Sequence, residues 1–526
     1  MTQHRFTNSI RGTGLALVLV PFVLISVQAC TDLDETPTSS ITPNNFYRNE
    51  AEVIGGLAAV YAQLRNQFPG QSGSYFFNLS EITTDEMIVP TRGSDWFDNG
   101  RWLELHRQTW AAASPSGLED MNSAWITAFS GVARANVVLG ALENVQVANK
   151  DVVEAELRAL RAYYYYQLMD LFGGVPIVTT TEIITRPRNT RAEVFAFIET
   201  ELKAARVLLP RADQLSAANH GRFTKGAADA ILANMYLNAR VFTGEVTAAG
   251  LQPGAPRWQD AINFADSVLN SGVYTLAPAG EWQKNFAHDN HLSRENIFVV
   301  KHLNVDGLGL RLINATLHYN QFTPSPWNGF STLAEAYNAF DAADQRRQIF
   351  LVGPQVNVET GVPVNDRAGK PLVFTPAIGD ARQAAENEGA RILKYTVDPE
   401  HVGPDHSNDF VLFRLGEIYL IKAEAQFELG NTAGALLNLN VLRARVFNPP
   451  KPLTSVDRDV ILRERLFELT GEGKRRQDLI RHGKYTNQWS TTMLNGKVQR
   501  EPYRILFPIP QTQIDANPEL VQNAGY

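Results

Sequence analysis

A polar segment near the start of the chain, "RGSDWFDNGRW" (residues 92–102), carries two tryptophans among turn-forming and charged residues. Large aromatic side chains usually lie in a core, because burying one stabilises a fold by roughly 1.5–3 kcal/mol. In a loop, a flat indole can instead cover the apolar face of a ligand while polar neighbours bind its rim. A sugar ring has such a face and such a rim. We therefore expect a binding site here, with Trp96 and Trp102 as platforms or loop anchors and the following polar partners: Arg92, Asp95, Asp98, Asn99 and Arg101.

A second segment, "HYNQFTPSPWNG" (residues 318–329), has the same character. It offers Tyr319, Gln321 and Trp327 in a loop that two prolines, Pro324 and Pro326, stiffen. We predict that these three side chains also contact the ligand. The remaining tryptophans considered lie in or beside helical segments and are expected in the core: Trp110, Trp125 and Trp258.

Paired carboxylates raise the alternative of glycoside hydrolysis. A glycosidase needs two carboxyl groups about 5–5.5 Å apart for retention, or about 6.5–9.5 Å apart for inversion. The segment "SEITTDEM" and the tryptophan loop supply the candidates, which are Glu81, Asp85, Glu86, Asp95 and Asp98. The sequence contains no nucleophile elbow, phosphate loop or dinucleotide fingerprint. We therefore expect binding without catalysis, and we retain a hydrolase that uses Asp95 and Asp98 as an alternative.

Metal binding has weaker support. The segment "DPEHVGPDHSND" (residues 398–409) brings His401, Asp405, His406 and Asp409 together, and "HDNH" contributes His288 and His291. Neither has zinc-type or EF-hand spacing. The sequence predicts no metal site and no cofactor.

Charge and the first residues bear on location. The chain has 526 residues and a formal charge of −7, without a basic run, so we expect no nucleic-acid partner. Residues 1–29 have the pattern of a signal peptide, because Arg5 and Arg11 precede the apolar run 14–27, which is too short to span a membrane.

The only cysteine, Cys30, follows this run directly. "VQAC" (residues 27–30) resembles a bacterial lipoprotein cleavage site, although Gln28 replaces the usual small residue. We predict lipidation of Cys30 and a flexible tether over residues 30–43. The tether's acids Asp32, Asp34 and Glu35 resemble a signal that directs lipoproteins to the cell surface in some Gram-negative bacteria.

Helical periodicity dominates the elements that would carry these loops. It predicts helices over residues 50–64, 124–142, 151–172, 191–209, 224–242 and 257–272, and a helix–turn–helix over 413–446. Asp151 and Glu154 suggest a capping box for the third helix. Four consecutive tyrosines, 163–166, cannot share one face of that helix, so we expect it to be packed on most sides.

Residues 275–408 differ from the rest, because proline, glycine and asparagine are dense there. Short strands are expected at 296–303, 348–353, 371–376 and 391–397, with a hairpin turn at 367–370. We predict one domain over residues 44–526, in which a helical scaffold (44–274 and 409–526) holds this loop-rich binding region.

Four long stretches resemble one family. They are "RALRAYYYYQLMDLFGGVPIV" (158–178), "NDFVLFRLGEIYLIKAEAQFELGN" (408–431), "ILRERLFELTGEGKRRQDLIRHGKY" (461–485) and "FPIPQTQIDANPELVQNAGY" (507–526). In type and order they resemble the SusD/RagB family, and the lipoprotein start matches as well. The charged residues in these stretches are expected to organise the fold: Arg414, Glu417 and Glu424 should pair with one another or with Arg475 and Arg476, and Asp478 should pair with Arg481.

The resemblance implies a mainly α fold, a SusD-like stack of tetratricopeptide-like helical pairs with short β-strands in a loop-rich region. It implies a lipid-anchored protein at the surface of the outer membrane. It also implies capture of a nutrient, most often an oligosaccharide, for a SusC-like TonB-dependent transporter. A helical-repeat scaffold that binds another protein remains an alternative, although it would not explain aromatic side chains in loops.

Overall fold

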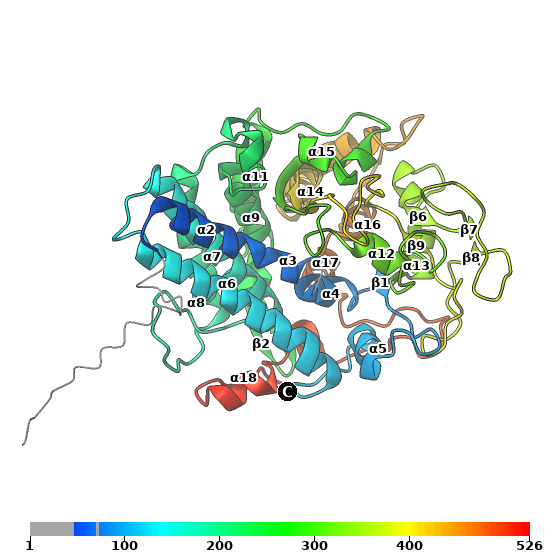
Figure 1. The fold of residues 1–526 in the computed structure, drawn as a ribbon, viewed down its shortest axis with the longest axis horizontal. Coiled ribbons are helices and arrows are strands. Elements are labelled where there is room, and N and C mark those ends of the chain that lie inside the picture. The colour runs from blue at the N-terminus through cyan, green and yellow to red at the C-terminus, as the bar shows by residue number, and fades with distance from the viewer. Residues whose placement is uncertain (1–46, 70–72) are drawn as a thin grey trace, which may run out of the picture.

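The computed structural model describes residues 47–69 and 73–526. The predicted signal peptide (1–29), the predicted lipidation site Cys30 and the predicted tether (30–43) lie outside this range. The described fold is mainly helical with short strand pairs, as the sequence predicts (Figure 1). Within the described residues, none of the helices has both the length and the apolar character that a membrane span requires.

Every predicted helical segment coincides with one or two α-helices, and the structure adds further helices, mostly short, that the periodicity did not predict. The α-helices are α2 (Glu50–Ala62), α3 (Leu64–Gln67), α4 (Tyr75–Glu81), α5 (Arg101–Arg107), α6 (Asn122–Ala141), α7 (Lys150–Phe172), α8 (Arg191–Leu208), α9 (Lys225–Leu237), α10 (Ala239–Phe242), α11 (Trp258–Leu269), α12 (Leu312–Thr316), α13 (Ala334–Ala339), α14 (Leu415–Glu428), α15 (Thr432–Ala444), α16 (Arg458–Leu469), α17 (Arg475–Arg481) and α18 (Gln511–Ala516).

The long helices form a continuous stack. α2 packs on α6, α6 on α7, α7 on α8, α8 on α9, α9 on α11, α11 on α14, and α14 on α15. In Figure 1 this stack occupies the left and the top of the molecule, and short strands and loops occupy the right. The stack is the helical scaffold that the sequence predicts.

The capping box predicted at Asp151 is wrong. α7 already begins at Lys150, and Asn149 precedes it in a left-handed conformation with no side-chain cap. The complete capping box belongs to α8 instead, where Thr190 and Glu193 bond each other's backbone. The stop predicted after Phe172 is confirmed, since Gly173 has a φ of 78°.

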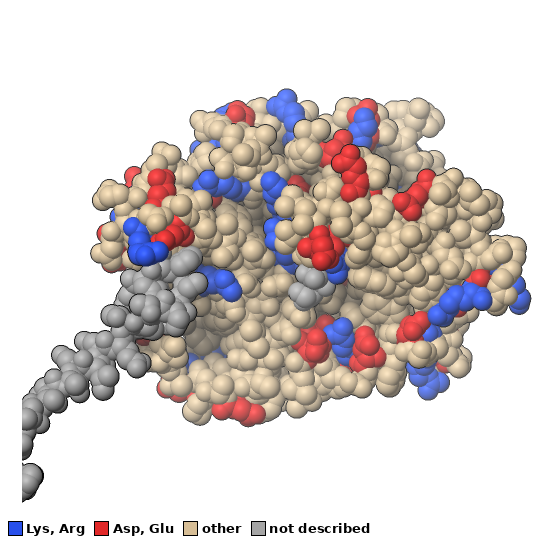
Figure 2. Space-filling model, viewed as in Figure 1, with Lys and Arg blue, Asp and Glu red and all other residues tan. Residues whose placement is uncertain are grey.

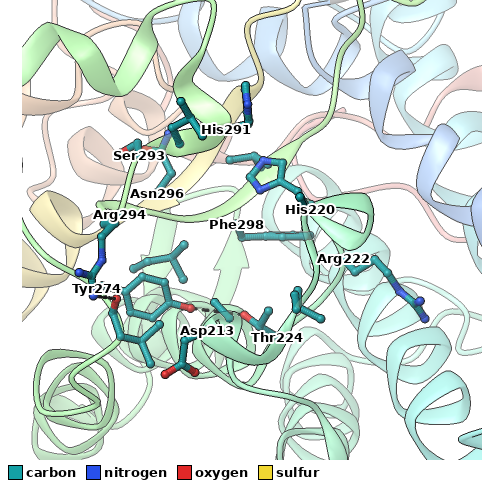
Figure 3. Close-up of a pocket in the computed structure, with 18 of the residues that line it drawn as sticks. Asp213, His220, Arg222, Thr224, Tyr274, His291, Ser293, Arg294, Asn296 and Phe298 are labelled. Carbon is teal, nitrogen blue, oxygen red and sulfur yellow. Dashed lines mark hydrogen bonds between the residues drawn. The ribbon is translucent and has the colours of Figure 1, made fainter.

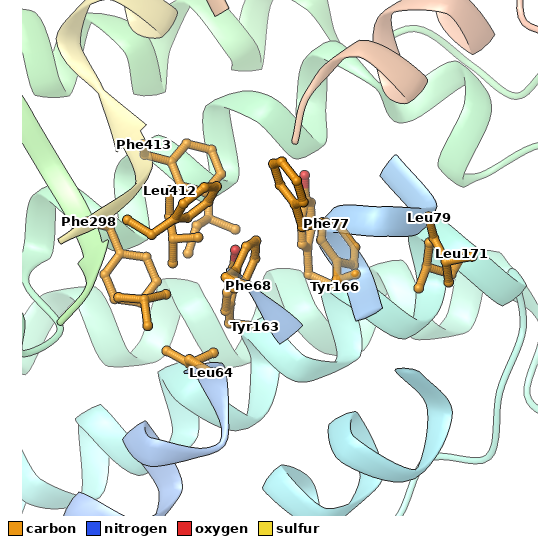
Figure 4. Packing of buried hydrophobic residues seen from close by; sticks show 14 of the residues in the cluster. Leu64, Phe68, Phe77, Leu79, Tyr163, Tyr166, Leu171, Phe298, Leu412 and Phe413 are labelled. Atoms are coloured by element: carbon orange, nitrogen blue, oxygen red, sulfur yellow. The ribbon is translucent and has the colours of Figure 1, made fainter. Parts of the chain in front are cut away.

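Helix α7 is the centre of the main core. All four tyrosines of the run are at most 2% exposed, which confirms that the helix is packed on most sides. Tyr164 donates to the carbonyl of Val60 on α2, and Tyr166 donates to Asn234 on α9. Figure 4 shows Tyr163 and Tyr166 beside phenylalanines from α4 and from the strands. Opposite faces of α7 therefore hold different neighbours.

The strands of the described residues form antiparallel pairs. They are β1 (Met87–Ile88) with β5 (Ser331–Thr332), β2 (Glu245–Thr247) with β3 (Gly250–Gln252), β4 (Asn296–Val300) with β10 (Phe410–Arg414), β6 (Phe350–Leu351) with β9 (Arg391–Ile392), and β7 (Gly353–Pro354) with β8 (Val373–Phe374). Every predicted strand segment contains one of these strands, although most are only two residues long. The predicted turn at 367–370 is confirmed, because the backbone amide of Asp366 donates to the carbonyl of Lys370 at 2.7 Å.

Strand β10 overturns part of the prediction for residues 413–446. Phe413 and Arg414 belong to the strand, and the helix starts only at Leu415. The pairing of β10 with β4 joins the two ends of the loop-rich region. That region is thereby fastened to the scaffold at its base.

The charge pairs predicted for Arg414 are also wrong. Its buried guanidinium contacts Glu295 at 2.8 Å, Glu468 at 2.7 Å and Glu472 at 2.8 Å. Because Arg414 lies in a strand, its side chain does not share a helix face with Glu417 or Glu424.

Of the other predicted ion pairs, one forms and the rest are replaced by pairs with different partners. Glu424 pairs with Arg481, while Arg475 pairs with Asp85 and Arg476 with Asp170. Within α17 the predicted pair of Asp478 and Arg481 is confirmed at 2.9 Å. Local spacing therefore predicted the pair within one helix, and the tertiary fold chose the others.

Candidate functional site

Strand pairing brings the two aromatic loops together. β1 ends at Ile88, just before the loop of residues 92–102, and its partner β5 begins at Ser331, just after the loop of residues 318–329. Met87 pairs with Thr332 and Ile88 pairs with Ser331. The antiparallel register therefore places the end of one loop beside the start of the other.

The first loop is held in an unusual backbone conformation. Arg92 and Asp95 exchange backbone hydrogen bonds at 3.0 Å in both directions. Trp96, Asp98 and Asn99 then have positive φ values of 61°, 38° and 55°. Non-glycine residues seldom adopt such values, and strained backbone of this kind clusters at functional sites. The turn directs the tryptophan loop back over the second loop.

Three aromatic rings form the floor between the loops. Trp96 lies edge-on to Trp102 with ring centroids 5.5 Å apart, and both rings contact Phe330, at 5.9 and 5.8 Å. The indole of Trp102 donates to a carboxylate oxygen of Asp98 at 2.7 Å. The guanidinium of Arg101 lies over the ring of Trp102, 4.3 Å from its centroid.

This floor opens as a pocket of about 160 Å³. Trp96, Trp102 and Trp327 all line it, together with Phe330 and the guanidinium groups of Arg101 and Arg311. The pocket thus combines aromatic surface with hydrogen-bonding side chains, which is the composition of a site for a small polar ligand.

Tyr319 extends the site beyond the pocket. Its hydroxyl donates to a carboxylate oxygen of Asp95 at 2.5 Å, and the guanidinium of Arg367 lies 4.0 Å from its ring centroid. Burial and the neighbouring Asp95 carboxylate raise the pKa of Tyr319 to about 12, so the hydroxyl keeps its proton at neutral pH. The tyrosine therefore ties the second loop to the first.

Known proteins and family models match most of the chain. The model of the SusD family matches residues 327–526, and a second model, described as "Starch-binding associating with outer membrane", matches residues 35–237. The starch-binding protein SusD of Bacteroides thetaiotaomicron is 25% identical, over 97% of this chain and 98% of its own length. The chain belongs to the SusD family.

Solved structures agree with this assignment in fold. A SusD-like protein from Bacteroides fragilis superposes with a TM-score of 0.74 at 21% identity, covering 91% of this chain and 98% of that one. Surface glycan-binding protein A from Bacteroides thetaiotaomicron, solved in complex with laminarihexaose, has a TM-score of 0.70 at 20% identity over 90% of this chain and 99% of that one.

In this SusD family member, burial removes two expected residues from the ligand-contacting set. Arg92 is 2% exposed, and its guanidinium donates to the carbonyls of Asn328 and Glu388 and to the hydroxyl of Ser331. Gln321 is fully buried and its amide bonds Gln355 and the backbone of His318. Both side chains hold the second loop in shape, and neither can reach a ligand.

The three tryptophans of the candidate site differ in how much of each side chain is exposed. Trp102 is 3% exposed, so it supports the pocket from beneath, whereas Trp327 is 37% exposed. Trp96 is half-buried and lies between them. Asp95 is half-buried, while Asp98 and Asn99 are exposed at the rim. Of the tryptophans expected in the core, Trp110 and Trp125 are buried and Trp258 is half-buried.

Sequence reasoning missed Phe97. This side chain is 57% exposed in the first loop, which makes it the most exposed aromatic residue of that loop. Its position between Trp96 and Asp98 was the available signal, since a third aromatic residue in a polar turn has no core to enter.

The carboxylates considered for hydrolysis are engaged by the SusD fold. Glu81 and Glu86 are at most 1% exposed and accept backbone hydrogen bonds from Gly473 and Gly471. Burial raises the pKa of Glu86 to about 7, and burial together with the neighbouring Glu86 carboxyl group raises the pKa of Glu81 well above its ordinary value. Asp85 pairs with Arg475. Asp95 and Asp98 bond Tyr319 and Trp102, as described above.

A larger pocket, of about 390 Å³, lies elsewhere, between the start of α9 and β4 (Figure 3). Three of its polar side chains are already paired within the fold: His220 with Asp409, Arg222 with Glu156, and Tyr274 with Thr224. The smaller tryptophan pocket, with an exposed indole at its edge, is therefore the better candidate.

Proposed function

We propose that this protein is a cell-surface lipoprotein that binds a glycan in the tryptophan pocket and delivers it to a SusC-like TonB-dependent transporter. The observation that carries the proposal is the convergence of Trp96, Trp102 and Trp327 on one pocket from loops far apart in the sequence. A planar indole fits the C–H face of a pyranose, and the carboxylates and amide at the rim can accept or donate hydrogen bonds to its hydroxyls.

The relatives support the ligand class. One is named for starch binding, and one solved neighbour holds laminarihexaose. The proposal assigns binding without turnover, since Asp95 and Asp98 each accept a hydrogen bond from an aromatic side chain of the site.

Affinity electrophoresis and calorimetry on the chain without residues 1–30 test glycan binding. Starch and laminarin are the first probes, followed by a wider polysaccharide panel. We expect saturable binding to at least one polysaccharide and no release of reducing ends on prolonged incubation. Absence of binding to every polysaccharide would overturn the proposal, and product formation that Asp95→Asn or Asp98→Asn abolishes would favour the hydrolase.

The transporter partner is tested separately, by pulldown from native outer membranes in mild detergent. We expect a TonB-dependent β-barrel in near-stoichiometric amount. Recovery of a soluble protein in its place, together with no glycan binding, would favour the helical-repeat scaffold.

A further inference from the structure

The charged groups around the tryptophan pocket bear on which glycans it accepts, an inference that rests on the proposed function. Two guanidinium groups line the pocket in the described part of the chain, those of Arg101 and Arg311. Two such cations would ordinarily suggest a site for uronate or sulfate groups, because guanidinium binds both in bidentate geometry.

The contacts of Arg311 argue against that reading. Its guanidinium makes a bidentate pair with the buried carboxylate of Asp405, at 2.8 and 2.7 Å, and lies 3.9 Å from Asp306. Asp405 is fixed in turn by the backbone amides of Gly307 and Gly309. The edge of the guanidinium group formed by Nε and Nη2 is therefore already occupied, and its charge is compensated.

Arg101 is compensated in the same way. Its Nη1 lies 3.4 Å from Asp120 and 3.5 Å from Glu119, and its Nε lies 3.9 Å from Asp98. Burial raises the pKa of Asp120 to about 6, so this carboxyl group is largely ionised at neutral pH. The two pocket cations thus face five carboxyl groups, which are Asp98, Glu119, Asp120, Asp306 and Asp405.

Exposure decides which sign a ligand meets. The side chains of Arg101 and Arg311 are 18% and 14% exposed. Their partners Asp98, Glu119 and Asp306 are 51%, 56% and 92% exposed. Around Tyr319 the order of exposure is reversed, since Arg367 is 50% exposed and its partners Asp95 and Glu386 are 38% and 23% exposed, but two carboxylates there face one guanidinium group. On the face shown in Figure 2, acidic and basic side chains are interspersed. No broad basic surface on this face would therefore cancel the repulsion from exposed carboxylates.

From this arrangement we infer that the site selects uncharged glycans and discriminates against those that carry uronate or sulfate groups. The aromatic surface supplies attraction that does not depend on charge, and the exposed acids repel an anionic ring. Because exposed charges are screened by salt, the discrimination should weaken as ionic strength rises.

The test compares polysaccharides that share a backbone and differ in charge: laminarin with sulfated laminarin, and amylose with amylose oxidised at C6. Neutral and acidic plant and algal polysaccharides complete the panel. We expect the anionic form to bind at least about 5-fold more weakly at low salt, the effect of one like-charge contact at about 4 Å in water. The difference should shrink towards molar salt.

A charge-neutralising variant locates the effect. Glu119 and Asp306 are chosen because each contacts only a pocket arginine by an ion pair. The double variant Glu119→Gln/Asp306→Asn should reduce the difference in affinity between the neutral and the anionic form of each polysaccharide. The matched control Glu143→Gln/Asp151→Asn makes the same change in net charge at exposed positions just after α6 and in the first turn of α7, and it should leave the difference in affinity unchanged.

The outcomes separate the two proposals. Equal or tighter binding of the anionic forms by the unaltered protein would overturn the selection of uncharged glycans and leave glycan binding intact. If the control variant reduces the difference in affinity between neutral and anionic polysaccharides by the same amount, the discrimination depends on net charge, and the local mechanism is overturned. Absence of binding to the whole panel would refute the proposed function, and the selectivity with it.

Discussion

The indole N–H of Trp96 donates a hydrogen bond to the backbone carbonyl of Trp327, 2.7 Å away across a sequence separation of 231 residues. With the bonds of Tyr319 to Asp95 and of Arg92 to Asn328, this bond joins the two loops of the candidate site. It also gives Trp96 a second function besides lining the pocket, because its ring fixes the backbone that presents Trp327.

The same contact makes Gly329 a sensitive position. A Cβ atom at this residue would lie 2.3 Å from the ring of Trp96, so Gly329→Ala must displace the indole. We expect the variant to lose up to about 1–3 kcal/mol of stability, as in overpacked cores, and to bind glycan more weakly. Gly55→Ala is the control, because nothing lies near its Cβ in helix α2. Thermal unfolding and calorimetry measure both effects, and unchanged affinity in Gly329→Ala would separate Trp96 from the site.

Because Trp327 is partly exposed and Trp102 is buried, we expect substitution of Trp327 to impair binding and substitution of Trp102 to impair stability. Trp327→Ala should weaken glycan binding by roughly 5- to 30-fold, equivalent to about 1–2 kcal/mol of lost stacking, while stability changes by about 0.5 kcal/mol. Trp102→Ala should instead destabilise the fold by about 3–5 kcal/mol. Early melting of Trp327→Ala with normal affinity in the folded fraction would make it an anchor and contradict the site.

Phe97 tests the part of the site that sequence reasoning missed. Since the ring is 57% exposed, Phe97→Ala should leave the melting temperature almost unchanged. If the ring contacts ligand, affinity should fall several-fold, and Phe97→Tyr should restore it. Titration of both variants with the best polysaccharide decides the matter, and wild-type affinity in Phe97→Ala would exclude the residue.

The buried carboxyl pair predicts a pH dependence of stability. The pKa of Glu86 rises from 4.5 to about 7 on folding, so between these values the folded protein holds a proton that the unfolded chain has lost. This contribution to stability is fully present below about pH 4.5 and is lost as the pH rises through about 7. Glu86→Gln cannot ionise, and its carbonyl oxygen can still accept from Gly471.

Urea unfolding at pH 5 and pH 8 measures the effect. As the pH rises from 5 to 8, the free energy of unfolding of Glu86→Gln should increase by about 2–3 kcal/mol relative to that of the unaltered protein. The exposed Glu335→Gln should show no such gain. Parallel behaviour of all three proteins would mean that Glu86 is ionised throughout.

Lipidation at Cys30 is a prediction from the sequence alone. Cys30→Ala should abolish fatty-acid labelling and release the protein from the membrane, because two or more acyl chains anchor firmly while one chain holds only marginally. Metabolic labelling and membrane fractionation measure this. Labelling that persists in Cys30→Ala would move the anchor elsewhere.

The sequence by itself determined most of the scaffold. Helical periodicity located the long helices, the tyrosine run correctly indicated a helix packed on most sides, and the four long stretches identified the SusD family. These features are encoded locally, since periodicity follows from 3.6 residues per turn and a long stretch keeps its order. The two tryptophan loops were also recognisable, because aromatic residues in a polar turn have no local core.

Only the tertiary structure decided what each residue of these loops does. Arg92, Asp98 and Trp102 have the same sequence surroundings, yet the fold buries Arg92 beneath Asn328, inserts Trp102 under the pocket and leaves Asp98 at the rim. The pairing of β1 with β5 brings residues 92–102 to residues 318–329, and pairing of two-residue strands leaves no periodic signal in either segment. Arg414 found its partners Glu295, Glu468 and Glu472 in the same way, through contacts that chain spacing does not encode. Burial and pairing over such separations depend on where the whole chain packs. For this physical reason the sequence could suggest the two candidate loops but could not assign their contacts.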